Sequence, residues 1–369
     1  MAVPIAKSYI LKIFSKYFGL SIFIFVSLLV MLNFIGIVNR GVLAGFSLYF
    51  FAASIFYLLP TIVAMSLPLA FLLATLLSLG QMSQDGEVLA LRAAGFSFFE
   101  IFSWVFWAAA ICSLLLAAVN HWIGPAGQKI SGDFTETMLT RVTKIDLKPR
   151  TFQKLSDWTL YADSVNSLTG EMRGVKLERR IDKKAAPAII NKIGADKGRY
   201  AVTLGRGLEL ALFDGQLSQT DLGRPETALY GSFSAYSTLL PFFAESGAKR
   251  RLSPKELVTP ELFSRAAAAE DSDQAARYRV EAMSRFAMAL APLAFFLVGA
   301  PLGVGLDKRG RSAGFALTLP VILLYYGLTI AAMVLSRKHG ALYPWAIFVP
   351  AALTASAGVL LWKRKLYAR

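Results

Sequence analysis

The sequence predicts a helical membrane protein with six transmembrane helices and an inserted all-β domain of the jelly-roll type. Two observations carry this prediction. Long stretches of the chain contain no Asp, Glu, Lys or Arg, and 20 of the 24 acidic residues lie in one central region, between 124 and 283. Because a bilayer core about 30 Å thick is spanned by roughly 20 apolar helical residues, each charge-free stretch can be compared with that length.

Five of the stretches have the length of one span each. They are 18–38, 101–123, 286–306, 312–336 and 339–362. The stretch 41–84 is too long for one straight helix and too short for two helices with a loop. We interpret it as an interfacial segment over 41–49 that leads into one long span ending near Gly80. A proline removes an internal backbone hydrogen bond, so this span is expected to bend at Pro60 or Pro68.

The Lys and Arg residues beside the spans predict that both termini are cytoplasmic, because short loops rich in these residues stay on the cytoplasmic side. Eleven such residues flank the spans on the side of the termini, against three on the opposite side. The central region is then periplasmic. The predicted order is spans one to three within 1–123, a β domain over 124–251, a helical return segment over 252–283 and spans four to six within 284–369.

Short runs with alternating or β-branched residues predict strands in the β domain. These runs are 158–162, 172–177, 188–193, 199–204 and 208–213. Turn residues separate them at 168–170, 196–198, 205–207 and 214–215. A spacing of about ten residues between runs is typical of a sandwich or jelly roll. In the return segment, Ser253, Pro254 and Glu256 have the pattern of a helix start with a capping box.

Motifs and composition argue against an enzyme and against nucleic-acid binding. The sequence has no phosphate-binding loop, HExxH, CxxC or GxSxG motif, so we predict no catalytic residue, metal site or cofactor in this chain. The formal charge of +15 is explained by topology and by contact with anionic lipids. The interiors of the predicted spans have no Asp, Glu, Lys or Arg to couple an ion gradient, so a second chain is expected to supply the energy.

The segment 83–97, between the second and third spans, is the sharpest local signal. It predicts a short cytoplasmic helix with two acidic residues near its positive N-terminus and Gly95 as its C-terminal stop. Such a helix suits either a groove of a soluble partner or the lipid surface. A lipid-surface helix favours Lys and Arg, whereas this one is mainly acidic, which favours the protein partner. The residues predicted to couple to that partner are Asp85, Glu87, Leu89 and Arg92.

The chain resembles the LptF/LptG permeases of lipopolysaccharide export over nearly its whole length. The segment 83–97 is similar to the family signature SE(x)xxLRAxGxS, with Glu87 and Arg92 in the Glu and Arg places. Further similar stretches follow in the family's order. They are 207–217, 278–281, 301–303 and 309–315.

The resemblance implies one half of an ABC exporter in the bacterial inner membrane. A paired LptF/LptG-type permease completes the cavity, and an LptB-type cytoplasmic ATPase dimer binds ATP and Mg. The jelly roll then passes lipopolysaccharide to an LptC/LptA-type periplasmic bridge. In this pattern Glu87 takes the place of the coupling-helix acid that meets an ATPase arginine, and Asp85 assists it.

The phosphates of lipid A imply basic residues at the outer rim of the cavity, because Arg and Lys bind phosphate through charge-assisted hydrogen bonds. Arg40 closes the first span at that face, and a basic cluster lies where the β domain returns to the membrane. The cluster consists of Lys249, Arg250 and Arg251. Interfacial snorkelling of Arg40 and a solvated loop for the cluster are the alternative interpretations.

Two further points stay open at the level of sequence. Gly299 and Gly303 form a GxxxG run, which allows close helix packing and could also form a gating hinge. Two other functional classes are a permease of a different lipid or lipoprotein exporter, and a membrane-anchored scaffold without a transport cycle. Six spans and the acidic short helix disfavour both classes. Co-purification with a nucleotide-binding subunit would separate a transporter from a scaffold.

Overall fold

The chain forms two compact units in the computed structural model. The residues that the structure describes are 2–41, 48–140, 147–155, 158–167, 169–183, 186–203, 207–221, 228–241, 252–305, 311–338 and 344–367. The helical unit comprises Met1–Phe34, Ile55–Ser131 and Leu252–Arg369, and the β unit comprises Ile35–Ser54 and Gly132–Arg251.

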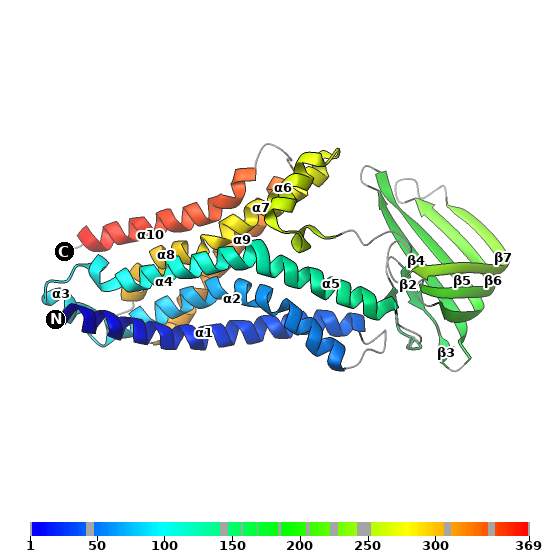
Figure 1. Ribbon diagram of the computed structural model, residues 1–369. Coiled ribbons are helices and arrows are strands. Elements are labelled where there is room, and N and C mark those ends of the chain that lie inside the picture. The colour runs from blue at the N-terminus through cyan, green and yellow to red at the C-terminus, as the bar shows by residue number, and fades with distance from the viewer. Residues whose placement is uncertain are drawn as a thin grey trace. The chain divides into compact units, whose positions relative to one another are not determined.

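Six segments of the described chain are helical, long and apolar enough to cross a membrane, which confirms the predicted number of spans. They are α1 (Ala2–Gly41), α2 (Leu48–Gln84), α4 (Phe98–Ala118) with η1 (Val119–Ile123) and α5 (Gly124–Thr140), α7 (Ser272–Ala289) with α8 (Ala291–Val304), α9 (Arg311–Lys338) and α10 (Val349–Tyr367) (Figure 1). The shorter helices are α3 (Glu87–Ala93), η3 (Pro254–Glu256), α6 (Thr259–Ala268) and η4 (Pro344–Phe348).

α2 is one helix that contains both Pro60 and Pro68, as predicted for a single long span. Most of the predicted interfacial segment, 42–47, lies outside the described residues. The third span also continues beyond its apolar part, because η1 is a π-helical turn and α5 follows it without a break. A π turn inserts one extra residue into a helix and is frequent at functional sites. Residue 124, the expected start of the β domain, therefore lies inside a continuous helical rod.

Close contacts between helices are made at glycines. A Cβ atom added at Gly299 of α8 would lie 3.2 Å from Cδ1 of Leu72, and one at Gly303 would lie 3.1 Å from Cβ of Leu79. Both neighbours belong to α2, so the GxxxG run lies in a helix–helix contact. Gly358 of α10 lies closer still to α8, because its Cβ would be 2.5 Å from the carbonyl carbon of Leu297.

α1 packs on the other helices mainly near its start. Ile10 and Phe14 are buried in one hydrophobic cluster with Phe71 of α2. Further along α1, Phe23 is 70% exposed and Met31 is 63% exposed. Large exposed apolar surfaces mark contact with a membrane or with another protein, so most of α1 is available to lipid or to a second subunit.

The β unit contains one antiparallel sheet of seven described strands. They are β1 (Gln153–Leu155), β2 (Trp158–Tyr161), β3 (Ser164–Asn166), β4 (Glu171–Lys183), β5 (Ala186–Thr203), β6 (Gly207–Asp221) and β7 (Leu229–Pro241). The order is β1-β2-β4-β5-β6-β7, with β3 also paired to β4. The inserted all-β domain is thus confirmed. Its described strands follow one another in sequence, without the Greek-key crossovers of a double-sheet jelly roll.

One row of residues crosses this sheet without bridging pairs, and we call it the bend row. It consists of Asp163, Gly174, Asp196, Asp214 and Ser234. The strand register is unchanged on either side, since Arg173 pairs with Lys197 and Val175 pairs with Ala195. Gly174 and Asp214 have φ values of 60° and 51°, in the left-handed region that extended strands do not use.

Side chains along each strand alternate between the core and the other face of the sheet, and this alternation shifts by one residue at the bend row. On β4, Met172 is buried on one side of the row, whereas Val175 and Leu177 are buried on the other side. An uninterrupted strand would have placed Met172 and Val175 on opposite faces. Buried residues from both sides of the row belong to one hydrophobic core, so the sheet bends over that core.

The bend row explains where the predicted strands and turns differ from the structure. The turns predicted at 196–198 and 214–215 are wrong, because these residues lie inside β5 and β6. Their Asp and Gly residues do favour turn-like backbone. Here that backbone bends the sheet instead of reversing the chain. The strands predicted at 188–193 and 199–204 therefore form one strand, β5. The turn predicted at 205–207 connects β5 to β6, and residues 204–206 lie outside the described part of the chain.

Candidate functional site

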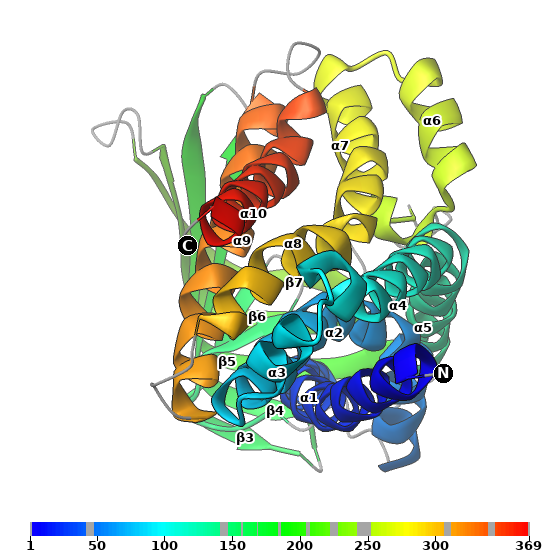
Figure 2. The ribbon, with the colours of Figure 1, turned by 90° about the vertical axis from the view of Figure 1, so that its left-hand side faces the viewer.

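The candidate site is the end of the helical unit that carries both chain termini and α3 (Figure 2). α3 is shorter than the predicted segment 83–97, because α2 runs on through Gln84. Two contacts hold this extension in place: Met82 is buried in the core, and the Ser83 hydroxyl donates to the carbonyl of Val304 at 2.9 Å. Gly86, with φ of 76°, then separates the two helices.

The end of α3 is a Schellman motif at Gly95, which confirms the predicted stop. The N–H of Phe96 donates to the carbonyl of Leu91 at 3.1 Å, and the N–H of Gly95 donates to that of Arg92 at 2.9 Å. Gly95 has φ of 93°, the left-handed backbone that this motif requires. The chain turns at once into α4, whose first turn is fixed by a capping box formed with Ser97.

The apolar residues of α3 divide between the core and the surface. Val88 is buried, and Leu91 packs against the same cluster of helix side chains. Leu89, on the other side of the helix, is 73% exposed. α3 is therefore fixed to the spans through one face, and it presents Leu89 on the other.

The charged residues of this segment have different roles. Glu87 accepts a hydrogen bond on Oε1 from the Tyr9 hydroxyl at 2.6 Å, whereas its Oε2 is shielded from water and has no hydrogen-bond partner among the described residues. Asp85 is exposed. The guanidinium of Arg92 lies 4.2 Å from the centre of the Phe98 ring, a cation–π contact that holds α3 against α4. Arg92 thus contacts its own chain, while Asp85 and Leu89 lie on the surface.

Nothing in the sequence pattern singled out Tyr9, and the same is true of Tyr17. Tyr17 donates from its hydroxyl to Oε1 of Gln81 at 2.5 Å. The two tyrosines are eight residues apart, which places them on similar faces of α1. They tie the start of α1 to the end of α2 and to α3. Their eight-residue spacing could have indicated that both tyrosines share a face of α1. It could not have identified Glu87 and Gln81 as their hydrogen-bond acceptors.

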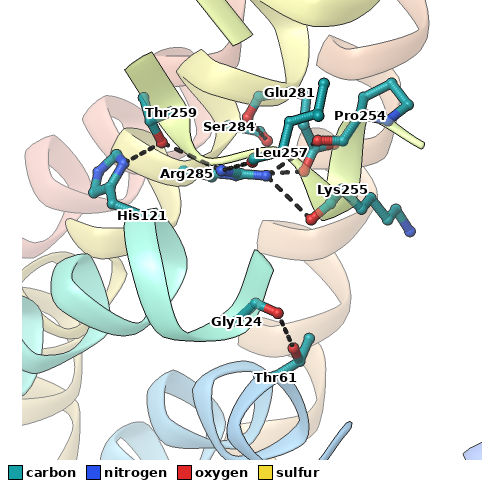
Figure 3. Close-up of polar contacts among 10 residues, drawn as sticks. All are labelled: Thr61, His121, Gly124, Pro254, Lys255, Leu257, Thr259, Glu281, Ser284 and Arg285. Atoms are coloured by element: carbon teal, nitrogen blue, oxygen red, sulfur yellow. Dashed lines mark hydrogen bonds and ion pairs between the residues drawn. The ribbon is translucent and has the colours of Figure 1, made fainter. Parts of the chain in front are cut away.

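A second polar cluster surrounds Arg285 of α7 (Figure 3). Arg285 is only 5% exposed. Its Nη1 donates to the carbonyl of Leu257 at 2.8 Å and to Oγ1 of Thr259 at 3.3 Å. Its Nη2 donates to the carbonyls of Pro254 and Lys255 at 3.2 and 3.3 Å. One guanidinium therefore holds the carbonyl groups of the η3 turn.

Two further side chains complete this cluster. Nδ1 of His121, in the π turn η1, lies 2.6 Å from Oγ1 of Thr259. Oε1 of Glu281 lies 3.6 Å from Nε of Arg285. The cluster thus joins the third span, the fourth span and the return segment. The capping box predicted at Ser253 is confirmed, but it starts the η3 turn that Arg285 binds rather than a long helix.

Of the remaining residues of the sequence prediction, those with described side chains take no part in either cluster. Pro60 and Pro68 lie within α2, and Gly299 and Gly303 face it. Arg40 belongs to the last turn of α1, and its side chain lies outside the described residues. The basic cluster Lys249, Arg250 and Arg251 also lies outside them.

The chain matches a known protein family over most of its length. The model of the family described as "Lipopolysaccharide export system permease LptF/LptG" matches residues 8–364. This range includes α3, the β unit and nearly all of the six membrane-spanning segments. No match was found among curated proteins.

Proposed function

The chain belongs to the LptF/LptG family of lipopolysaccharide export permeases, and from this we propose that it forms one half of the membrane part of an ABC exporter. It is a multi-pass inner-membrane protein of a transport family. In our proposal a second LptF/LptG-type permease pairs with it, and the two take lipopolysaccharide out of the inner membrane. A separate LptB-type ATPase dimer binds ATP and Mg and supplies the energy.

The energetics of the cargo favour a path with apolar walls. Burial of one methylene in lipid is worth about 0.8 kcal/mol, so an acyl chain of about twelve carbons resists extraction by roughly 10 kcal/mol. A lipid with several such chains resists by several times that amount. The transporter must therefore offer apolar surface at each stage. The exposed apolar side chains along α1, such as Phe23 and Met31, agree with this requirement.

The surface of α3 is the observation that carries the proposal. α3 is anchored through its buried face and presents Leu89 on its surface, near the carboxylate of Glu87. The turn just before α3 exposes Asp85. An exposed apolar residue flanked by acids is complementary to a groove that offers an apolar pocket and a cationic donor. We propose that the ATPase provides this groove and that its donor is an arginine that meets Glu87.

The proposed orientation places both termini and α3 in the cytoplasm and the β unit in the periplasm. Its support is the excess of Lys and Arg beside the spans on the side of the termini. In this orientation Arg40 and the cluster 249–251 belong to the periplasmic side, where we propose that they contact lipid phosphates.

β7 supports transfer to a periplasmic β bridge, because it is the last strand of the sheet among the described residues. β7 pairs with β6 on one side, and its 13 residues contain no charged side chain. Proteins usually protect an exposed strand edge with charged residues or proline within the strand. An edge without charges suits pairing with a strand of another protein. We propose that an LptC-type β domain adds to this edge and receives the lipid.

Glu87→Arg tests the docking of the ATPase. We expect this variant to lose lipopolysaccharide-stimulated ATP hydrolysis, because like charges then meet at the interface. The exposed Glu178 of β4 provides a matched control, and Glu178→Arg should leave hydrolysis unchanged. Normal ATPase binding and normal export by Glu87→Arg would contradict the proposal.

Thiol labelling tests the orientation. Ser167 in the β unit and Ala93 of α3 are both exposed, whereas the native Cys112 is buried. A membrane-impermeant reagent added outside the inner membrane should label Ser167→Cys and should not label Ala93→Cys. The opposite pattern would reverse the proposed orientation.

A further inference from the structure

The contact between Tyr9 and Glu87 is short and involves a charged acceptor. A hydroxyl-to-carboxylate distance of 2.6 Å is typical of a charge-assisted hydrogen bond, which is stronger than a neutral one. The bond joins residues 78 positions apart, from two helices that no short loop connects. It therefore restrains the orientation of the Glu87 carboxylate from outside α3.

The packing of α1 fixes the position of the backbone at Tyr9. Ile10, the next residue, is buried, and Phe14 stands one turn further along with its ring 5.2 Å from that of Phe71. Because these anchors belong to the same helical segment, the backbone at Tyr9 is held in place before any partner arrives, and the hydrogen bond to Glu87 orients the hydroxyl. Such preorganisation reduces the cost of forming a contact.

The second oxygen of Glu87 has unused hydrogen-bonding capacity. Oε2 is shielded from water and has no hydrogen-bond partner among the described residues. An unpaired shielded carboxylate oxygen carries an unfavourable free energy, because water does not solvate its share of the negative charge. A cation that docks beside this carboxylate therefore gains more from its charge than from that of a freely hydrated carboxylate.

We propose that Tyr9 is a positioning residue of the coupling site: its hydrogen bond to Oε1 of Glu87 holds the carboxylate, and with it the negative charge, in the orientation that the cationic donor of the ATPase meets. This inference rests on the proposed function. Without the Tyr9 hydroxyl, the Glu87 side chain turns toward water, and the donor must then compete with hydration.

Tyr17 distinguishes positioning from simple anchoring of α1. Its hydroxyl also ties α1 to the neighbouring helix, but its acceptor is the neutral side chain of Gln81. If the hydroxyl of Tyr9 only anchors α1, Tyr9→Phe and Tyr17→Phe should have similar effects. If Tyr9 positions the charge of Glu87, only Tyr9→Phe should reduce coupling.

The experiment is a double-mutant cycle in the full exporter, reconstituted in nanodiscs with the ATPase that co-purifies with this chain. Lipopolysaccharide-stimulated ATP hydrolysis is measured for Tyr9→Phe, Glu87→Gln, the double variant and Tyr17→Phe. We expect Tyr9→Phe to reduce the stimulated rate about threefold to tenfold, as fits one charge-assisted hydrogen bond at a partly exposed site. The lipopolysaccharide concentration for half-maximal stimulation should not change. Tyr9→Phe should have no further effect in the Glu87→Gln background.

Three results would overturn the inference: a normal rate for Tyr9→Phe, additive losses in the double variant, or an equal loss for Tyr17→Phe. Its failure can be told apart from failure of the proposed function. If no ATPase co-purifies, or if Glu87→Gln hydrolyses ATP normally, the proposed function itself is wrong. If Glu87→Gln loses activity and Tyr9→Phe does not, only the role of Tyr9 is refuted.

Discussion

Arg285→Met should destabilise the helical unit strongly. Met fills much of the volume of the arginine stem but has no hydrogen-bond donor. The carbonyls of Pro254, Lys255 and Leu257 would each lose a donor, and Glu281 would lose its charge partner. The carbonyl of Pro254 keeps the N–H of Leu257 at 3.4 Å. A shielded polar group left unpaired costs about 1–3 kcal/mol, so the other two carbonyls set an upper range of roughly 2–6 kcal/mol. Removal of the buried charge offsets part of this, and loss of one partner from a buried pair typically costs about 3–5 kcal/mol net.

Thermal unfolding of the purified chain in detergent can measure this effect. For a unit of this size, about 3–5 kcal/mol corresponds to a decrease of the midpoint on the order of 10 °C. Arg265→Met is the matched control, because Arg265 and Glu261 form an ion pair whose side chains are 39% and 43% exposed. Exposed pairs contribute about 0–1 kcal/mol, so this control should unfold close to the wild type. Equal midpoints for the two variants would show that the η3 carbonyls are rehydrated without cost.

Two further predictions concern glycines. In Gly358→Ala, the new Cβ would lie 2.5 Å from the Leu297 carbonyl carbon, so α8 and α10 must separate, at a cost of about 1–3 kcal/mol in the free energy of unfolding. Gly327→Ala is the control, because its new Cβ meets no atom within 4 Å and should leave stability unchanged. Equal stability of the two variants would contradict the close packing at Gly358. Gly174→Ala should destabilise the β unit by at least about 1–2 kcal/mol, because its left-handed backbone disfavours a side chain. Amide hydrogen exchange in β4 and β5 should show this loss, whereas Gly194→Ala on the same sheet should show none.

The membrane spans could be predicted from the sequence because the absence of charge over about 20 residues is a signal along the chain itself. The C-terminal end of α3 could be predicted for the same reason, since its signal, Gly95 and the residues just before it, lies within a few positions of the chain. The bend row was different. Asp214 and Gly215 favour turn backbone whether the chain reverses or only bends. The choice depends on Gly174 and Asp196, which meet the same row only after the strands have paired.

The two polar clusters could not be found in this way. Tyr9 lies 78 positions from Glu87, and Arg285 lies 26 to 31 positions from the groups it binds in the return segment. A single Tyr near a membrane surface, or a single Arg before an apolar run, is common and has no periodic pattern. Their roles follow from acceptors that tertiary packing brings to them.

The bend row has a consequence for how the strands find their partners while the chain folds. In an evenly alternating sheet, a slip of two residues keeps every apolar side chain on the same face, so the pattern alone does not prevent it. Here a two-residue slip of β5 against β4 would separate Asp196 from Gly174. The change of face would then occur at different heights on the two strands. Between those two heights, one strand would point its polar side chains toward the hydrophobic core. The shared irregularity therefore penalises misalignments that an ideal sheet would tolerate.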